Sequence, residues 1–322
     1  MKPFNHTSAA SVSDAASQLS SANGGAQVIA GGTDLLGVLH DRILPSYPAT
    51  LVDLKAIPNL DYINSDTSGL KIGALTTLTE IANSATVSGA YPALSQAASQ
   101  VATPQIRNMG TAGGNLCQDV RCWYYRYPNY VGGRFLCLRK GGTTCYGAVG
   151  INTYHSIFGG PKGCYCVYPS DLATALVALN ASVVTNTRTI PIESFFDALA
   201  GTVLKSGEIV TEVDVPTPPS GSKQTFTKFR VRKTIDFATA EVATMVTMNG
   251  TTCTAARIAL GGVAPTPLRS SAAETAIVGK TLDANAAAAA GAAAVASATP
   301  LQYNGFKVPL LKTLVTRALT PS

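Results

Sequence analysis

The segment QVIAGGTDLLGVL, residues 27–39, passes from a short apolar strand through two glycines into the start of a helix. Glycines in front of a helix let backbone N–H groups approach an anion, and the helix dipole supports its binding. The segment matches neither G-x-G-x-x-G nor G-x-x-x-x-G-K-[ST], so it predicts a phosphate site that is not of the ordinary Rossmann or P-loop kind. A plain turn in which Thr33 or Asp34 caps the helix is the alternative interpretation.

A second glycine-rich turn, IRNMGTAGGNL, spans residues 106–116. It comes after a predicted strand at 70–74 and a predicted helix at 92–101. Two such turns in one α/β unit suggest a large ligand that is contacted both at its phosphates and at its rings.

A proline-rich segment at residues 216–222 marks a domain boundary, and a chain of 322 residues suits two or three domains. The chain after the boundary contains three predicted strands and two predicted helices, at 225–232, 239–248, 253–260, 284–298 and 310–319. Strands followed by helices are typical of an α+β domain.

The composition excludes two classes of protein. Hydrophobic residues make up 46% of the chain and charged residues only 13%, whereas disorder needs low hydrophobicity and many charges. No apolar run approaches the ~20 residues that cross a bilayer, so no membrane span is predicted.

The first residues lack the basic head and apolar stretch of a signal peptide. We therefore expect a cytoplasmic protein, or one that is exported while bound to a partner.

The chain has seven cysteines, and six of them fall within fifty residues. They are Cys117, Cys122, Cys137, Cys145, Cys164 and Cys166, with Cys253 standing apart. An odd count in a large chain argues against a disulfide scaffold. Buried free thiols are one interpretation, and zinc is another, although only the first two cysteines have the C-x2-4-C spacing of a structural zinc site. The wide spacings favour an iron–sulfur cluster held by four thiolates on a long loop.

Positive charge is concentrated in the same segment. Residues 120–170 contain six basic side chains and no aspartate or glutamate, which equals the net charge of +6 of the whole chain. Eight of the twelve tyrosines and the single tryptophan, Trp123, also lie there. Such a segment is compatible with nucleic acid, but with the cysteines it favours an anionic cluster that basic residues compensate and aromatic rings shield. No nucleic-acid partner is therefore expected.

Four short motifs, in this order, resemble the FAD-binding subunit of the xanthine dehydrogenase (molybdenum hydroxylase) family. They occupy residues 30–36, 72–74, 111–116 and 169–172, and the resemblance covers nearly the whole chain. It implies an α+β fold. A two-part FAD-binding domain of the PCMH (vanillyl-alcohol-oxidase-like) type is expected at 1–216, in subdomains of about 1–57 and 58–216. A small α+β C-terminal domain of the CO-dehydrogenase-flavoprotein type is expected at 223–322.

The segment between Asn115 and Asp171 is much longer than in ordinary members of this family. The insertion, about residues 117–168, is similar to the loop that carries an additional [4Fe-4S] cluster in the flavin subunits of 4-hydroxybenzoyl-CoA reductase and of periplasmic aldehyde oxidoreductases. This similarity implies four cluster ligands, which are Cys122, Cys137, Cys145 and Cys164. Cys117 and Cys166 are left as spares, and the long interval between the third and fourth ligands leaves the substrate class open.

The resemblance also implies fourteen FAD contacts. The first glycine turn matches the pyrophosphate-binding turn, the second matches a flavin-contacting turn, and the remaining positions match contacts around the adenine, the ribose or the flavin ring. The residues are Ile29, Ala30, Gly31, Gly32, Thr33, Asp34, Leu35, Ala74, Thr111, Gly114, Asn115, Asp171, Leu204 and Lys228.

No arrangement for acid–base or nucleophilic catalysis is recognisable, and the three histidines, His6, His40 and His155, are isolated, so no catalytic residue is assigned. The resemblance implies a subunit that relays electrons. Substrate would react at a molybdopterin cofactor on a large partner subunit, and two [2Fe-2S] clusters on a small partner subunit would connect it to FAD on this chain. NAD or ferredoxin would be the external carrier. The alternatives are an ordinary FAD subunit whose cysteine loop binds zinc or docks a partner, and a non-flavin binding protein that uses the aromatic and basic loop.

Overall fold

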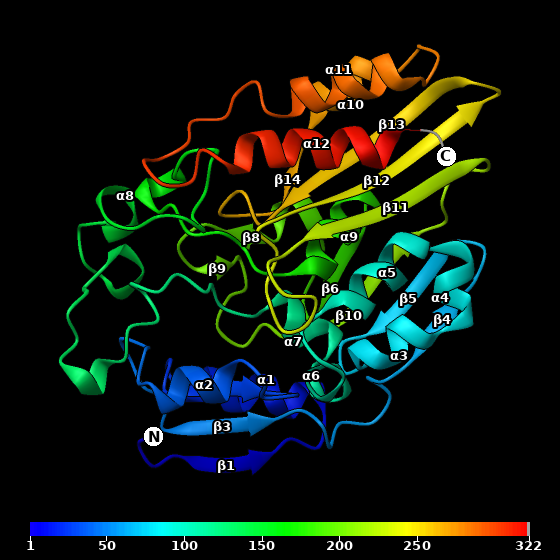
Figure 1. The fold of residues 1–322 in the computed structure, drawn as a ribbon. Coiled ribbons are helices and arrows are strands. Elements are labelled where there is room, and N and C mark those ends of the chain that lie inside the picture. Colours follow the sequence, from blue (N-terminus) through cyan, green and yellow to red (C-terminus); the bar gives the residue numbers. More distant parts are fainter. Residues whose placement is uncertain (321–322) are drawn as a thin grey trace.

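The computed structural model describes residues 1–320, which form three larger β-sheets, one two-stranded sheet and a set of mostly short helices (Figure 1). The α+β class that the sequence predicts is confirmed. Among these residues, no helix is both long enough and apolar enough to cross a lipid bilayer.

The N-terminal part is a three-stranded parallel sheet in the order β1-β3-β2. Its elements are β1 (Asn5–Ser8), α1 (Val12–Ser21), β2 (Ala26–Ile29), α2 (Leu35–His40) and β3 (Thr50–Asp53). Parallel neighbours need a crossover between them, which the helices supply. Strand β1 has no signal in the sequence because its residues are polar, and it forms by backbone pairing with β3.

The central part is an antiparallel five-stranded sheet in the order β4-β5-β10-β6-β7. Its strands are β4 (Ile63–Ser65), β5 (Gly69–Gly73), β6 (Ser182–Thr185), β7 (Thr189–Pro191) and β10 (Val210–Pro216). The helices of this part are α3 (Leu78–Asn83), α4 (Ala85–Ala90), α5 (Pro92–Gln100), α6 (Pro104–Met109), α7 (Ala112–Leu116) and α9 (Asp171–Ala178). All eight residues of α9 are buried, so this helix forms the centre of the main core. A small hairpin pairs β8 (Phe196–Asp197) with β9 (Gly201–Thr202).

The C-terminal part is an antiparallel sheet in the order β11-β12-β13-β14. Its elements are β11 (Ser222–Phe229), β12 (Ala240–Asn249), β13 (Thr252–Gly261), β14 (Leu268–Arg269), α10 (Ser271–Ile277), α11 (Ala284–Ala294) and α12 (Lys307–Leu319). A Cβ at Gly291 would lie 2.3 Å from Thr316 Oγ1 and 2.7 Å from Lys312 O. The alanine- and glycine-rich composition of α11 therefore allows close packing on α12.

The cysteine loop, residues 117–168, has little regular structure: η1 (Asn129–Val131), η2 (Leu138–Lys140), α8 (Tyr146–Val149) and η3 (Pro161–Gly163). It is fastened to the C-terminal part, and Figure 1 shows α8 beside the start of the red helix α12. Ile157 N donates to Val263 O at 2.9 Å. The buried ammonium of Lys307 donates to the carbonyl oxygens of Tyr154, His155 and Gly262 at 3.2, 3.2 and 2.7 Å.

Candidate functional site

The two glycine turns meet and form the floor of a cleft of about 470 Å³. The first turn follows the end of β2 and leads into α2, and the second leads into α7. A Cβ added at Gly31 would lie 1.9 Å from Met109 O, 2.7 Å from Met109 C and 3.0 Å from Gly110 Cα. Only glycine at position 31 lets the turns approach this closely.

The first turn is more than a capped helix start. Asp34 occupies the N-cap position of α2, but its side chain makes no capping hydrogen bond. Its carboxylate instead accepts a hydrogen bond from Asp119 N at 2.8 Å and pairs with Arg121 and Arg126 at 3.0 and 2.8 Å. The turn therefore ties the N-terminal part to the start of the cysteine loop.

Twelve of the fourteen predicted FAD contacts line the cleft. They are all residues from Ile29 to Leu35, together with Ala74, Thr111, Gly114, Asn115 and Leu204. The second turn is held in place by side-chain and backbone bonds: Thr111 Oγ1 accepts from Gly114 N at 3.2 Å, and Gly113 N donates to Ala74 O at 2.9 Å.

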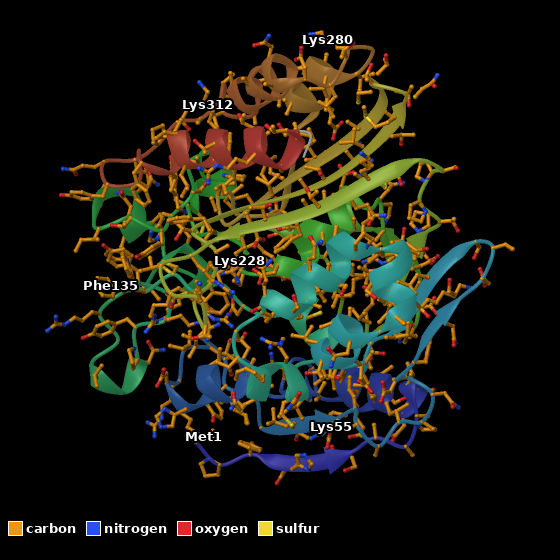
Figure 2. All side chains as sticks on the ribbon, turned by 45° about the vertical axis from the view of Figure 1, so that its right-hand side comes forward. Met1, Lys55, Phe135, Lys228, Lys280 and Lys312 are labelled. Atoms are coloured by element: carbon orange, nitrogen blue, oxygen red, sulfur yellow. The ribbon has the colours of Figure 1, made fainter. Side chains whose placement is uncertain are left out.

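The other two predicted contacts, Asp171 and Lys228, are not among the cleft-lining residues. Lys228 Nζ lies 2.6 Å from Asp171 Oδ2, and the side chains are 1% and 3% exposed. Lys228 lies near the end of β11, and Figure 2 labels it next to the helices of the central part. The structure therefore brings these two residues together as a buried ion pair behind the cleft.

Sequence reasoning missed two groups of cleft residues. Gln118, Asp119 and Arg121 follow the second turn directly in the sequence. Their closeness to that turn is the signal that could have identified them as cleft residues. Ile235 and Phe237 come from the loop between β11 and β12, which carries no recognisable motif.

Five of the clustered cysteines line one small cavity: Cys122, Cys137, Cys145, Cys164 and Cys166. The other residues that line it are Tyr124, Tyr125, Leu138, Arg139, Tyr146 and Gly147. The four predicted cluster ligands are therefore gathered together with one of the two spares. The other spare, Cys117, lines the cleft instead. Within residues 1–320, no three His, Cys, Asp or Glu side chains are grouped closely enough to hold a single metal ion.

The seven cysteines are free thiols. Burial raises the pKa of the Cys122 thiol to about 12. His155 Nε2 lies 3.2 Å from Cys122 Sγ. Burial, followed by the nearby charge of Lys307, lowers the pKa of His155 to about 4, so the imidazole is neutral at physiological pH.

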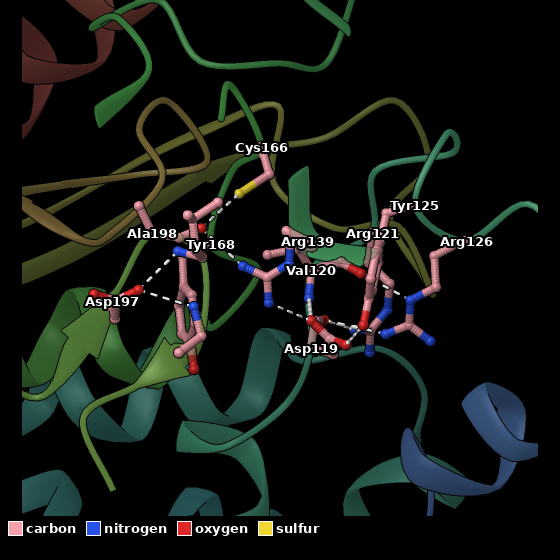
Figure 3. Close-up of polar contacts among 12 residues, drawn as sticks. Asp119, Val120, Arg121, Tyr125, Arg126, Arg139, Cys166, Tyr168, Asp197 and Ala198 are labelled. Atoms are coloured by element: carbon pink, nitrogen blue, oxygen red, sulfur yellow. Dashed lines mark hydrogen bonds and ion pairs between the residues drawn. The ribbon is translucent and has the colours of Figure 1, made fainter. Parts of the chain in front are cut away.

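The excess positive charge of the loop is largely neutralised by carboxylates outside residues 120–170. Arg121 and Arg126 pair with Asp34, Arg139 Nη2 lies 2.8 Å from Asp119 Oδ1, and Lys162 Nζ lies 2.5 Å from Asp197 Oδ2. Figure 3 shows Asp119 between Tyr125, Arg139 and the other arginines, where the Tyr125 hydroxyl donates to its carboxylate. The expectation that all six basic residues compensate a cluster is therefore corrected: most of them hold the loop to its surroundings.

A second cavity of about 470 Å³ adjoins the cleft, and Arg121 and Phe237 line both. The Arg121 guanidinium lies 4.6 Å from the centroid of the Phe237 ring. Cys122 borders this second cavity as well as the cysteine cavity. The three hollows thus meet at Arg121 and Cys122, which are consecutive in the chain.

Glu241 forms part of the inner wall of the second cavity. It faces Lys228 across β11 and β12, is 1% exposed, and accepts a hydrogen bond from Thr174 Oγ1 at 2.6 Å. Burial and the adjacent Asp171 carboxylate raise the pKa of Glu241 well above its usual range, which favours the protonated form.

Replacing Glu241 by glutamine should stabilise the protein at neutral pH. Unfolding frees the wild-type carboxyl to ionise near its usual pKa of 4.5, so rising pH above that value favours the unfolded state. The glutamine amide cannot ionise, and its oxygen can still accept from Thr174. We expect the melting temperature of Glu241→Gln at pH 7 to exceed that of wild type by ~2–4 °C, the shift for about 1 kcal/mol in a domain of this size. The gain should vanish toward pH 4 in melts recorded across the pH range, and a gain that is constant with pH would contradict the assigned protonation.

The sequence and the fold were compared with known proteins. Residues 2–218 match the family described as FAD binding domain in molybdopterin dehydrogenase, and residues 224–321 match the CO dehydrogenase flavoprotein C-terminal domain. The aldehyde oxidoreductase FAD-binding subunit PaoB of Escherichia coli (strain K12) is 34% identical over 304 residues, which are 89% of this chain and 88% of the relative.

The carbon monoxide dehydrogenase of Hydrogenophaga pseudoflava is similar to this chain both in sequence and in fold. The medium chain is 29% identical over 98% of this chain and 96% of the relative. The solved structure of the form that lacks the Mo-pyranopterin moiety has a TM-score of 0.78 at 28% identity, and it covers 99% of this chain and 96% of that chain. The chain therefore belongs to the FAD-binding medium subunits of the CO dehydrogenase and xanthine oxidase family.

Proposed function

We propose that this chain is the FAD- and [4Fe-4S]-carrying electron-transfer subunit of a heteromeric molybdenum hydroxylase. Its FAD domain would end at residue 216, where β10 ends, and its C-terminal domain would begin at 223, one residue after β11 begins. Bound FAD can exchange electrons singly with a cluster and in pairs with a nicotinamide. The protein's own contribution is to bind the groups, to place them and to set their electrostatic surroundings.

The cleft fits FAD in the chemistry of its walls. The first glycine turn, at the start of α2, would offer backbone N–H groups to the pyrophosphate. The second turn would contact the flavin, and the touching of the two turns at Gly31 fixes their separation. Apolar side chains for the rings line the rest of the cleft, among them Val101, Leu204 and Phe237. Leu204 is a contact that the sequence predicts, and it comes from the segment between β9 and β10 rather than from either turn.

The cysteine cavity supports the proposed cluster through the kind of residue that lines it. Each of four thiolates binds a different iron of a four-iron cluster. The four cysteines that the resemblance implies as ligands all border this one small cavity. Cys122, Cys137, Cys145 and Cys164 would hold the cluster, and the surrounding tyrosines would limit its access to water.

The observation that carries the proposal is the short connection between the two sites. The segment from Cys117 to Arg121 borders the FAD cleft, and the next residue, Cys122, borders the cysteine cavity. Asp34 of the first glycine turn holds this segment through Asp119 N and Arg121. A cluster ligand and the flavin site are therefore positioned by one continuous piece of chain.

The partners follow from the relatives, which are named as medium chains and FAD-binding subunits. We propose a molybdopterin-binding large subunit and a small subunit with two [2Fe-2S] clusters as the partners of this chain. NAD or ferredoxin would be the external carrier.

A reductive titration tests the proposed function. Anaerobic protein should take up about three electrons per chain, two into FAD and one into the cluster. The absorbance changes of the flavin and of the cluster should both be seen. Uptake of only about two electrons by iron-free, flavin-loaded protein would contradict the cluster. The chain would then be an ordinary FAD subunit whose loop binds zinc or docks a partner.

A further inference from the structure

One buried cation beside the cysteine cavity has no anionic partner. The Lys140 side chain is 7% exposed, and its Nζ donates to Asn129 Oδ1 at 3.0 Å and to Tyr127 O at 3.4 Å, both neutral acceptors. Among residues 1–320, no carboxylate lies within 4.0 Å of this ammonium. The neighbouring Arg139 differs, since its charge is neutralised by Asp119.

The position of Lys140 is set by a cysteine. Cys137 precedes the short helix η2, and Lys140 N donates to Cys137 O at 2.8 Å. Nζ lies 5.9 Å from the centroid of the Tyr125 ring, which lines the cysteine cavity. The Lys140 side chain thus packs against a residue of the cavity wall without lining the cavity itself.

A buried ammonium without a counter-ion is destabilising unless an anion lies near it. Lys140 contacts Cys137 through the backbone and Tyr125 through its ammonium, and both of these residues line the cysteine cavity. An anionic cluster held in that cavity would supply the missing negative charge.

We propose that Lys140 is the buried counter-charge of the cluster and sets its reduction potential. This inference rests on the proposed function, because it needs a cluster in the cysteine cavity. One-electron reduction adds one negative charge to the cluster without breaking a bond or moving a proton. A fixed positive charge nearby favours the more negative, reduced form. Removing that charge makes the cluster harder to reduce.

The test compares the midpoint potential of the cluster in four proteins by an EPR-monitored redox titration, with iron measured in each sample. Lys140→Gln removes the charge but can still donate to Asn129. We expect its ratio of reduced to oxidised cluster, at a fixed potential, to fall at least tenfold, which for one electron is a 59 mV shift to lower potential. Lys140→Arg keeps the charge and should restore the ratio to near the wild-type value. Arg134→Gln removes an exposed charge of the same loop and should leave it unchanged, because solvent screens that charge.

The outcomes separate the inference from the proposed function. Absence of iron from wild-type protein would refute the proposed function itself. An unchanged potential in iron-loaded Lys140→Gln would overturn the role of Lys140 alone. If Lys140→Gln lost its iron and Lys140→Arg kept it, the positive charge would be needed for the cluster to assemble, which supports the inference. If both variants lost their iron, Lys140 would only pack the loop.

Discussion

Alanine in place of Gly31 should weaken FAD binding by roughly 100-fold. The new Cβ would stand 1.9 Å from Met109 O and 2.7 Å from Met109 C, which are backbone atoms that cannot rotate away. The two glycine turns would have to separate, and crowding of this kind costs ~1–3 kcal/mol. The pyrophosphate site of the first turn and the flavin contacts of the second turn would then no longer fit one FAD molecule. Flavin fluorescence during titration of FAD into deflavinated protein measures the loss.

Gly89→Ala is the matched control. Gly89 lies in α4, does not line the cleft, and a Cβ there would meet no atom within 4 Å. Alanine should leave the affinity for FAD unchanged and favour the helix by up to ~1 kcal/mol. If Gly31→Ala bound FAD as tightly as wild type does, the close approach of the two turns would not shape the FAD site.

Serine in place of Cys137 should remove the cluster and leave FAD bound. Cys137 is buried in the cysteine cavity and is not one of the residues that line the FAD cleft. A serine hydroxyl is a poor substitute for a soft thiolate ligand of iron. Iron per chain should fall from about four to below one, with flavin per chain unchanged, in anaerobically purified protein.

Cys117→Ser provides the comparison for this change. Cys117 belongs to the same loop but borders the cleft, so its replacement should not lower the iron content. Loss of both iron and flavin from Cys137→Ser would mean that the loop is structural for the flavin site. Unchanged iron in that variant would remove Cys137 from the ligand set.

The sequence predicts which residues line the cleft best where these residues belong to one continuous motif. Each glycine turn joins a strand or a loop to a helix, and the backbone alone determines which of its residues face the cleft. Ile235 and Phe237 reach the cleft only because β11 and β12 place their connecting loop there. A local pattern carries no information about such a long-range position.

Asp171 and Lys228 illustrate a second limit of the sequence. The resemblance implies that both contact FAD, which stays a prediction, and the structure pairs them with each other as a buried ion pair. Their pairing depends on α9 packing against β11 and β12, which neither motif reveals.

The cysteine loop shows what clustering in a sequence can and cannot predict. Six neighbouring cysteines indicate one site, and five of them do gather around one cavity. The loop has almost no regular structure, so spacing alone does not distinguish Cys164 from Cys166, and both line the cavity. The charge pattern was misleading because Asp34 and Asp197, which lie far away in the sequence, neutralise three of the basic residues.

The most direct test of the account is the content of iron, zinc and flavin per chain in protein purified without oxygen. The account predicts about four irons, about one FAD and no stoichiometric zinc. One FAD without iron, in material kept anaerobic throughout, would contradict the cluster and leave an ordinary flavin subunit of the family.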